Sequence, residues 1–175
     1  SGKEPVLATR ELNSETFAGG IVAVANHASS FCDYPSLLTI LGEDGPHGEF
    51  VRQKVDPKVN TMFVNVDGSA SSIVKRRYIE WYPFQKLFEV YKMGDGGHSV
   101  AETSACYDKL KEVVPNFDVV VVTDYGHGMI GPEEVEVLSS QARFLAVNTQ
   151  VNAGNLGFNT ISKYPRADFI CLASH

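Results

Sequence analysis

A short polar loop follows the most apolar stretch of the sequence and carries the residues best suited to chemistry. Residues 118–123 include four consecutive valines, and Asp124, Gly126, His127 and Gly128 come directly after them. A carboxylate at the end of a buried strand can orient a metal-bound water or a substrate hydroxyl, and glycines let the backbone approach a ligand. The alternative is a tight loop in which Asp124 caps a turn. Spacing alone leaves both interpretations open.

Two further polar groups have side chains of the right type to bind sugar or phosphate oxygens. Asn148 and Gln150 follow the next apolar segment, although neutral amides are also common in ordinary loops. Lys75, Arg76 and Arg77 form a basic patch that could hold a phosphate. On a strand, successive side chains alternate in direction, so one of the three points away from the other two. A solvated strand face is the alternative for this patch.

Several common catalytic motifs are absent from the sequence. It contains no phosphate-binding loop ending in Gly-Lys-Ser/Thr and no G-x-G-x-x-G after a strand. It also has no G-x-S-x-G elbow of a serine hydrolase, and its histidines and cysteines lack the spacing of a zinc site. We expect Gly94–Gly97 to form a turn and no metal to be bound.

Strands and helices alternate along the chain and would position these residues in an α/β fold. The continuous hydrophobicity of residues 118–123 predicts a strand buried on both faces, as in a parallel sheet. Ser99 is suited to cap a helix, and Pro132 to open one. We predict strands at 6–12, 37–41, 61–66, 118–123, 144–147 and 169–172, a hairpin over 73–81 and 86–92, and helices at 19–31, 47–54, 99–114 and after residue 131.

Length and composition indicate one globular domain. The chain has 175 residues, 43% of them hydrophobic, and a net charge of −6. There is no overall basic excess to indicate nucleic-acid binding, and no apolar run approaches the roughly 20 residues of a membrane span. Cys32, Cys106 and Cys171 are scattered, which favours reduced thiols in the cytoplasm. The final segment, 168–175, reads as a buried strand with little after it, so we expect a fragment of a longer protein.

Four stretches of the sequence resemble the ribokinase/PfkB carbohydrate kinases, and most of all the heptose-phosphate kinase half of ADP-heptose synthases. Residues 4–20 are similar to the segment that ends in the family's Gly-Gly motif. Residues 38–44 resemble the strand and G-x-D turn of the family, and residues 118–128 its apolar strand followed by a D-Y-x-K-G loop. The hairpin at 73–92 resembles the strands of the lid.

The resemblance implies a ribokinase-like, mostly parallel sheet flanked by helices, with a small β lid at approximately 4–12 and 60–92 and an α/β core for the remainder of 1–175. The parent protein would phosphorylate a sugar or sugar phosphate with ATP and Mg²⁺. The catalytic base is expected beyond the C-terminus, so this chain alone is expected to be inactive. Substrate contacts are implied for some residues and cofactor contacts for others: Gly19, Gly20, Asn26, Lys75, Arg77, Asp124 and His127 for the substrate, and Asn148 and Gln150 for the cofactor.

The sequence departs from the family pattern at several of these positions. Ala23 stands near the place of a family asparagine, and Asn26 lies one helical turn later. His127 replaces the lysine of the loop motif, and Asn148 opens a segment that replaces an Asp-Pro-Lys sequence. These differences favour an alternative, a non-catalytic kinase-like module that binds a sugar phosphate or forms a homodimer through its lid strands.

Overall fold

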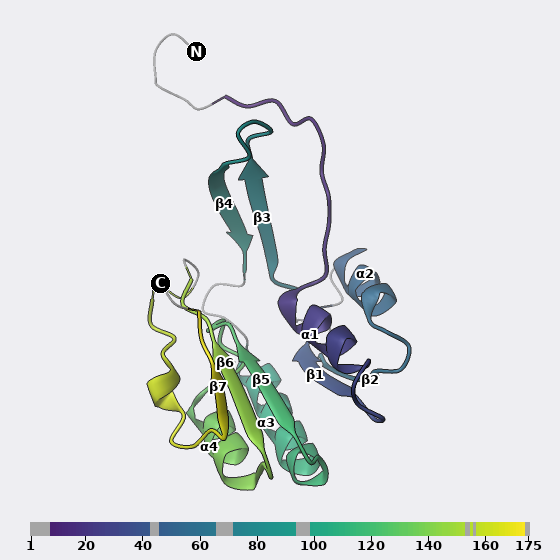
Figure 1. Cartoon of the computed structure of the whole chain (residues 1–175), viewed down its shortest axis with the longest axis vertical. Helices are drawn as coiled ribbons and strands as arrows, with labels where there is room; N and C mark the ends of the chain where they lie inside the picture. Colours follow the sequence, from purple (N-terminus) through teal and green to yellow (C-terminus); the bar gives the residue numbers. More distant parts are fainter. Residues whose placement is uncertain are drawn as a thin grey trace.

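The computed structural model describes residues 8–42, 46–65, 72–93, 99–152, 155 and 157–173. Helices and strands alternate along most of this part of the chain (Figure 1). The helices are α1 (Gly20–Ala28), α2 (Pro46–Lys54), α3 (Val100–Val113) and α4 (Pro132–Gln141), with short 3₁₀ helices η1 (Val114–Asn116) and η3 (Ile161–Lys163). The strands are β1 (Ser36–Ile40), β2 (Asn60–Val64), β3 (Val74–Ile79), β4 (Lys86–Lys92), β5 (Val120–Asp124), β6 (Leu145–Thr149) and β7 (Phe169–Cys171).

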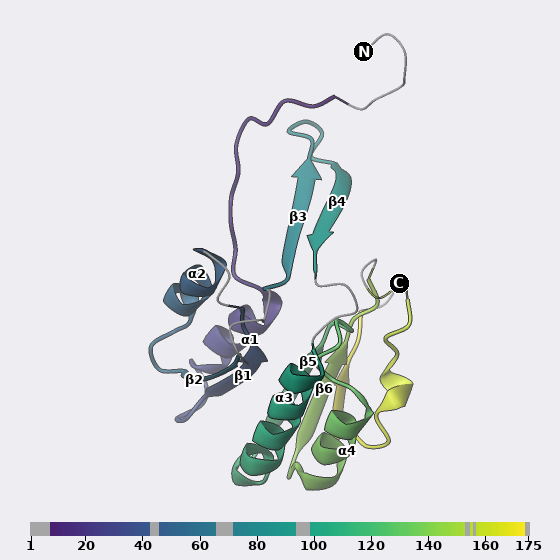
Figure 2. The same cartoon turned by 180° about the vertical axis from the view of Figure 1, so that it is seen from behind.

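The strands form two parallel sheets and one antiparallel hairpin. β1 pairs with β2 in parallel, and β5, β6 and β7 form a parallel sheet in that order. β3 and β4 pair antiparallel and project from the rest of the molecule (Figures 1 and 2). The predicted α/β class, with parallel sheets flanked by helices and a separate hairpin, is therefore confirmed.

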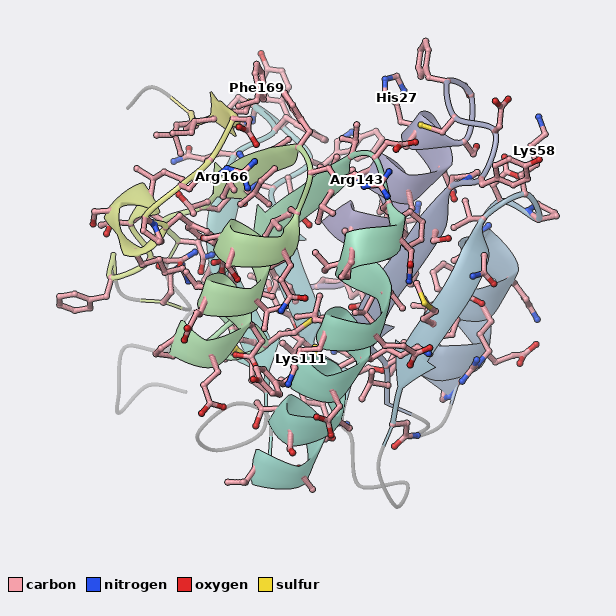
Figure 3. All side chains as sticks on the ribbon, turned by 90° about the horizontal axis from the view of Figure 1, so that it is seen from below. His27, Lys58, Lys111, Arg143, Arg166 and Phe169 are labelled. Atoms are coloured by element: carbon pink, nitrogen blue, oxygen red, sulfur yellow. The ribbon has the colours of Figure 1, made fainter. Side chains whose placement is uncertain are left out.

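The main core lies between the β5–β7 sheet and helices α3 and α4. Cys106 and Leu110 of α3, Leu138 of α4, and Leu145 and Val147 of β6 are all buried in this cluster. Leu38 and Ile40 of β1 pack against the edge of the same cluster. Figure 3, a view from below, shows α3 between α4 and the β1–β2 part of the molecule.

A second, smaller core joins α1 to the β1–β2 sheet. Val22 and Ala25 of α1 pack with Leu37 of β1, and with Val55 and Val59 before β2. Leu37 faces this cluster while Leu38 and Ile40 face the α3 cluster, because side chains alternate along a strand. The β1–β2 sheet is thus covered by α1 on one face and by α3 on the other.

Local sequence signals explain where α3 and α4 begin. The Ser99 side chain accepts a hydrogen bond from the Glu102 amide (3.2 Å), and the Glu102 carboxylate accepts one from the Ser99 amide (2.7 Å). This reciprocal capping box satisfies two amides that the helix itself cannot. Pro132 occupies the first turn of α4, where its missing N–H costs nothing. Both predicted helix starts are confirmed.

The prediction that β5 is buried on both faces is wrong for the described part of the chain. Val122 is buried under the helices, whereas Val119 and Val121 are 55% and 52% exposed. Their side chains share the sheet face opposite α3 and α4, where Phe144 and Phe169 are also exposed. Continuous hydrophobicity therefore does not reveal that the described helices cover only one face of this sheet.

The predicted extent of the lid also differs from the structure. Residues 60–64 form β2, which pairs with β1 in the core and not with the lid hairpin. Residues 8–12 form no strand and are exposed, while residues 4–7 and the Gly94–Gly97 turn lie outside the described residues. The hairpin β3–β4 is where we predicted it. Among the helices that the structure describes, none is long and apolar enough to cross a bilayer.

Candidate functional site

The loop after β5 has a conformation that depends on glycine. Gly126 has φ +68°, a value in the left-handed region that side chains disfavour. A Cβ at this position would lie 2.7 Å from the Asn155 side-chain nitrogen and 2.8 Å from Asn159 Cβ. The Gly126 amide donates to Asp124 Oδ1 (2.9 Å), so Asp124 does cap a turn. The close packing holds the loop against the segment after β6.

Asp124 is the centre of a buried hydrogen-bond network. Its side chain is 3% exposed, and Oδ2 accepts a hydrogen bond from the Tyr164 hydroxyl (2.8 Å) and an ion pair from Lys163 (2.5 Å). Asn159 donates to Oδ1 (3.2 Å). Burial and the neighbouring Asp124 carboxylate raise the pKa of Tyr164 above its ordinary value. These contacts, all within the chain, engage both carboxylate oxygens in holding the loop. A direct ligand contact by Asp124 stays a prediction.

His127 lies beyond this network on the same loop. Burial is the main cause of its lowered pKa. A hydrogen bond with Asn152 opposes this effect, nearby Lys75 adds a smaller lowering, and Asp124 a still smaller raising. The imidazole is therefore neutral at pH 7, unlike the lysine of the resembled motif. Its buried Nε2 atom has no hydrogen-bond partner within the part of the chain that the structure describes. A neutral ring nitrogen left in this state can donate to, or accept from, a polar ligand.

The N-terminus of α1 meets this loop at Tyr125. A Cβ on Gly20 would lie 2.1 Å from the Tyr125 hydroxyl, so only glycine permits this approach. A Cβ on Gly19, by contrast, would meet nothing within 4 Å. The Tyr125 and His127 rings are stacked, with centroids 6.4 Å apart. The predicted Gly-Gly pair and His127 are thus brought to the same edge of the molecule.

The basic patch of β3 is partly neutralised by the opposite strand. Glu89 on β4 forms ion pairs with Arg77 (2.6 Å) and Lys75 (3.2 Å), and it accepts a hydrogen bond from Tyr91 (3.0 Å). Arg77, with smaller help from Lys75 and Tyr91, lowers the pKa of the Glu89 carboxyl to about 2. Arg76 lies on the other hairpin face, as strand alternation predicts. Two cations and one carboxylate leave a net single positive charge for a phosphate.

The remaining predicted site residues lie in structural positions. The Asn26 side chain donates to the Lys54 carbonyl (2.8 Å) and accepts from the Asp56 amide (2.8 Å), tying α1 to the connection before β2. Asn148 donates to the Cys171 carbonyl (2.7 Å) on the neighbouring strand. Gln150 is exposed at the end of β6. The Asn26 and Asn148 side chains are thus engaged away from the His127 loop, whereas the Gln150 backbone amide donates to the Asp124 carbonyl (2.9 Å). The binding functions of all three side chains stay predictions.

Sequence reasoning missed the partners of Asp124. Lys163, Tyr164 and Asn159 lie 35–40 residues later in a segment of mixed polar and aromatic composition, which gave no motif. Asn152 and Asn155 both donate to the Tyr125 carbonyl (3.0 Å each). A density of asparagines after β6 was the available signal, and it marks loop support rather than ligand contacts.

A pocket of about 500 Å³ lies elsewhere, beside the start of α4. Its lining is mainly apolar and includes Ile130, Pro132, Val135 and Pro165. It contains none of the predicted site residues. Among the described residues, no group of three or more His, Cys, Asp or Glu side chains is arranged to hold a metal ion. Cys32, Cys106 and Cys171 form no disulfide with one another; Cys106 is buried and the other two are exposed.

Comparison with known proteins supports the fold and leaves the activity open. No family model matches the sequence, and no curated protein matches it. The structure is similar to the crystal structure of a possible 1-phosphofructokinase from Thermotoga maritima, with a TM-score of 0.59 and 15% sequence identity. The match covers 85% of this chain and 48% of the other, so the chain spans about half the length of that protein. The chain has a ribokinase-like α/β fold.

Proposed function

We propose that this chain is the sugar-facing lobe and lid of a carbohydrate kinase that acts on a sugar or sugar phosphate. The observation that carries the proposal is the meeting of three chain segments at the carboxyl ends of parallel strands. These are the Gly19–Gly20 start of α1, the Tyr125–His127 loop and the base of the lid hairpin at Lys75. Ligands of open α/β sheets bind at this edge. The fold likeness to a possible phosphofructokinase supports the same class.

In this proposal the chain alone does not catalyse phosphoryl transfer, because some of the groups that the reaction needs belong to the rest of the parent protein. The reaction needs a base near the attacking hydroxyl and donors that stabilise the transferred phosphoryl group. We assign ATP and Mg²⁺ to the parent protein, because the resembled family uses both and this chain spans about half the length of the solved relative. In the proposed role, the His127 imidazole and the first α1 amides bind sugar oxygens, and Lys75 faces a substrate phosphate. The finer resemblance to heptose-phosphate kinases belongs to this proposal, and so does a cytoplasmic location.

The second candidate is a non-catalytic module that binds a sugar phosphate or dimerises through its lid. The partial neutralisation of Lys75 and Arg77 by Glu89 favours this candidate, and so does the neutral His127. The hairpin face opposite Glu89 carries Tyr78 stacked on Phe88, with ring centroids 4.5 Å apart, and Val90, which is 49% exposed; Arg76 lies beside them on the same face. An exposed face of aromatic and aliphatic side chains with one arginine suits a homodimer contact.

Calorimetry with two variants of α1 tests the proposed site. Gly20→Ala forces Tyr125 away from α1, whereas His27→Gln changes an exposed α1 side chain outside the proposed site and serves as the control. We expect hexose and heptose phosphates to bind the wild-type chain and His27→Gln alike, and Gly20→Ala at least about tenfold more weakly. Equal binding by both variants, or no binding by the wild-type chain, would remove this edge from the site.

Turnover assays separate the two candidates. The 175-residue chain is expected to show no ATP-dependent phosphorylation of any of these sugars. The parent protein should show it if the chain is part of a kinase, and should bind without turnover if the chain is a binding module. If the isolated chain phosphorylated a sugar, the catalytic base and the nucleotide site would lie within these 175 residues. That result would contradict our assignment of both to the rest of the parent protein.

A further inference from the structure

The pocket beside α4 lies apart from the His127 loop and has no part in the proposed sugar site. Its volume is about 500 Å³, and pockets of about 300–1,000 Å³ are typical of sites that bind small molecules. Figure 3 labels Arg166, one of its lining residues, beside α4. A pocket of this size can hold a small organic molecule.

One face of α4 forms the longer wall of this pocket. The residues that α4 contributes recur every three or four positions, which places them on the same side of the helix: Pro132, Val135, Glu136, Ser139 and Ser140. The opposite wall comes from residues 163–166, and Ile130 and Gly131 close one end. Because most of this lining is apolar, burial of an apolar body would provide most of the binding free energy.

The side chain of Ser139 gives the pocket one unused polar group. Ser139 is 7% exposed, and its buried hydroxyl oxygen has no hydrogen-bond partner among the residues that the structure describes. The neighbouring Ser140 differs, because its hydroxyl donates to the Glu136 carbonyl (2.7 Å). A buried hydroxyl without a partner lowers stability. A ligand that forms a hydrogen bond with Ser139 would remove this cost.

The positive groups at the pocket already have acceptors. Lys163 pairs with Asp124 (2.5 Å), and Arg166 donates to the carboxylate of Asp168 (2.5 Å). The N-cap amide of α4 donates to the Glu134 carboxylate (2.8 Å), so the positive end of this helix is also occupied. An anion in the pocket would compete with these carboxylates. The lining therefore favours a neutral ligand.

We infer that this pocket binds a neutral, mainly apolar small molecule that hydrogen-bonds to Ser139, and that the bound molecule strengthens the ion pair between Lys163 and Asp124. Lys163 lines the pocket with a side chain that is 31% exposed, whereas Asp124 is already buried. A ligand that covers Lys163 removes water from the pair, and a lower local dielectric strengthens the attraction. The Gly126 amide donates to Asp124 Oδ1 (2.9 Å), so the loop after β5 is then held more firmly.

Titration of the isotope-labelled 175-residue chain with indole, followed by NMR, tests the inference. Indole is neutral and mainly apolar, and its N–H can donate to a serine hydroxyl. Benzoate, also aromatic but negatively charged, is the control ligand. We expect indole to shift the amide signals of Val135, Ser139 and Lys163 and to bind at least about tenfold more tightly than benzoate. No saturable binding, shifts confined to residues outside the pocket, or tighter binding of benzoate would contradict the inference.

The two adjacent serines of α4 provide matched variants for the titration. Ser139→Ala removes the unpaired hydroxyl, whereas Ser140→Ala removes a hydroxyl that is bonded within the helix. We expect Ser139→Ala to weaken indole binding about fivefold, since one hydrogen bond contributes roughly 1 kcal/mol, and Ser140→Ala to leave it unchanged. Equal binding by both variants would show that Ser139 does not hold the ligand.

A bulky residue in the wall tests the location of the site. Ser140→Trp fills the pocket and should weaken indole binding at least about tenfold, whereas Ser104→Trp, at an exposed position of α3, should not. Circular dichroism first establishes that each variant is folded. Unchanged binding by Ser140→Trp would place indole elsewhere. If further polypeptide of the proposed parent protein fills the pocket, indole will bind this chain and not the parent, and the inference is overturned.

Amide hydrogen exchange measures the effect of the ligand on the loop after β5. At saturating indole we expect the Gly126 amide to exchange at least about threefold more slowly. The Ser99 amide, which donates to Glu102 at the start of α3, is the control and should not change. Unchanged exchange at Gly126, or equal slowing of both amides, would contradict the proposed effect on the pair of Lys163 and Asp124.

Discussion

Asp124 and Glu89 are two carboxylates with similar partners and different surroundings. Each accepts an ion pair from lysine and a hydrogen bond from a tyrosine hydroxyl, and Glu89 also pairs with an arginine. The Asp124 side chain is 3% exposed beneath a loop, whereas the Glu89 side chain is 20% exposed on a two-stranded hairpin. Asp124 therefore holds distant segments together, while Glu89 mainly sets the local charge of the lid.

Removing the buried carboxylate is expected to have the largest effect on stability. Asp124→Ala removes the acceptor of the Tyr164 hydroxyl and the ion-pair partner of Lys163, which keeps its hydrogen bond to Asn159, and breaking such a pair costs about 3 kcal/mol. Urea denaturation should show this loss, whereas Asp118→Asn, at an exposed ion pair with Arg143, should cost less than about 1 kcal/mol. A stable Asp124→Ala chain that fails to bind sugar phosphates would instead make Asp124 a ligand-binding residue.

Gly126→Ala tests the loop that Asp124 supports. An alanine must adopt a positive φ and displace the Asn155 and Asn159 side chains, at a cost of about 1–3 kcal/mol. The free energy of unfolding, measured against Gly19→Ala, reports this effect. Equal stability of the two alanine variants would show that the loop adjusts easily and that Asp124 supports less than the structure indicates.

The pH dependence of the free energy of unfolding should report the protonation of His127. Its pKa is lowered in the folded state, so the unfolded chain takes up a proton more readily. The stability contributed by neutral His127 is therefore full above the ordinary histidine pKa of 6.5 and declines as pH falls below it. His127→Gln should reduce the slope of unfolding free energy between about pH 7 and pH 5. An unchanged slope would assign that dependence to other groups.

The exposed carboxylate should have the smallest effect. Glu89→Gln is expected to change stability at neutral pH by less than about 1 kcal/mol, because its ion pairs are partly solvated. Its folded pKa is about 2 against an ordinary 4.5, so its contribution is present above pH 4.5 and lost as pH falls toward 2. Acid titration of both chains measures this difference. If Glu89→Gln lowered the free energy of unfolding as much as Asp124→Ala, the two carboxylates would not differ in their contribution to stability.

Features that depend on residues close together in the sequence could be predicted, whereas those that depend on distant residues could not. Ser99 and its capping partner are three residues apart, and Pro132 acts within one helical turn, so both helix starts were visible. The ion pair between Arg77 and Glu89 forms because the antiparallel register places these two residues opposite each other. The sequence of the basic patch does not indicate this register. The patch therefore looked more suited to phosphate than it is.

The sequence alone determined the α/β order of elements, the hairpin and the position of the polar loop after β5, because these depend on local hydrophobic pattern and turn residues. Only the tertiary structure decided that Asp124 is anchored by Lys163 and Tyr164, and that one face of β5 is open. Both outcomes depend on which distant segments pack against the strand, and a run of valines reads the same whether or not a helix covers it.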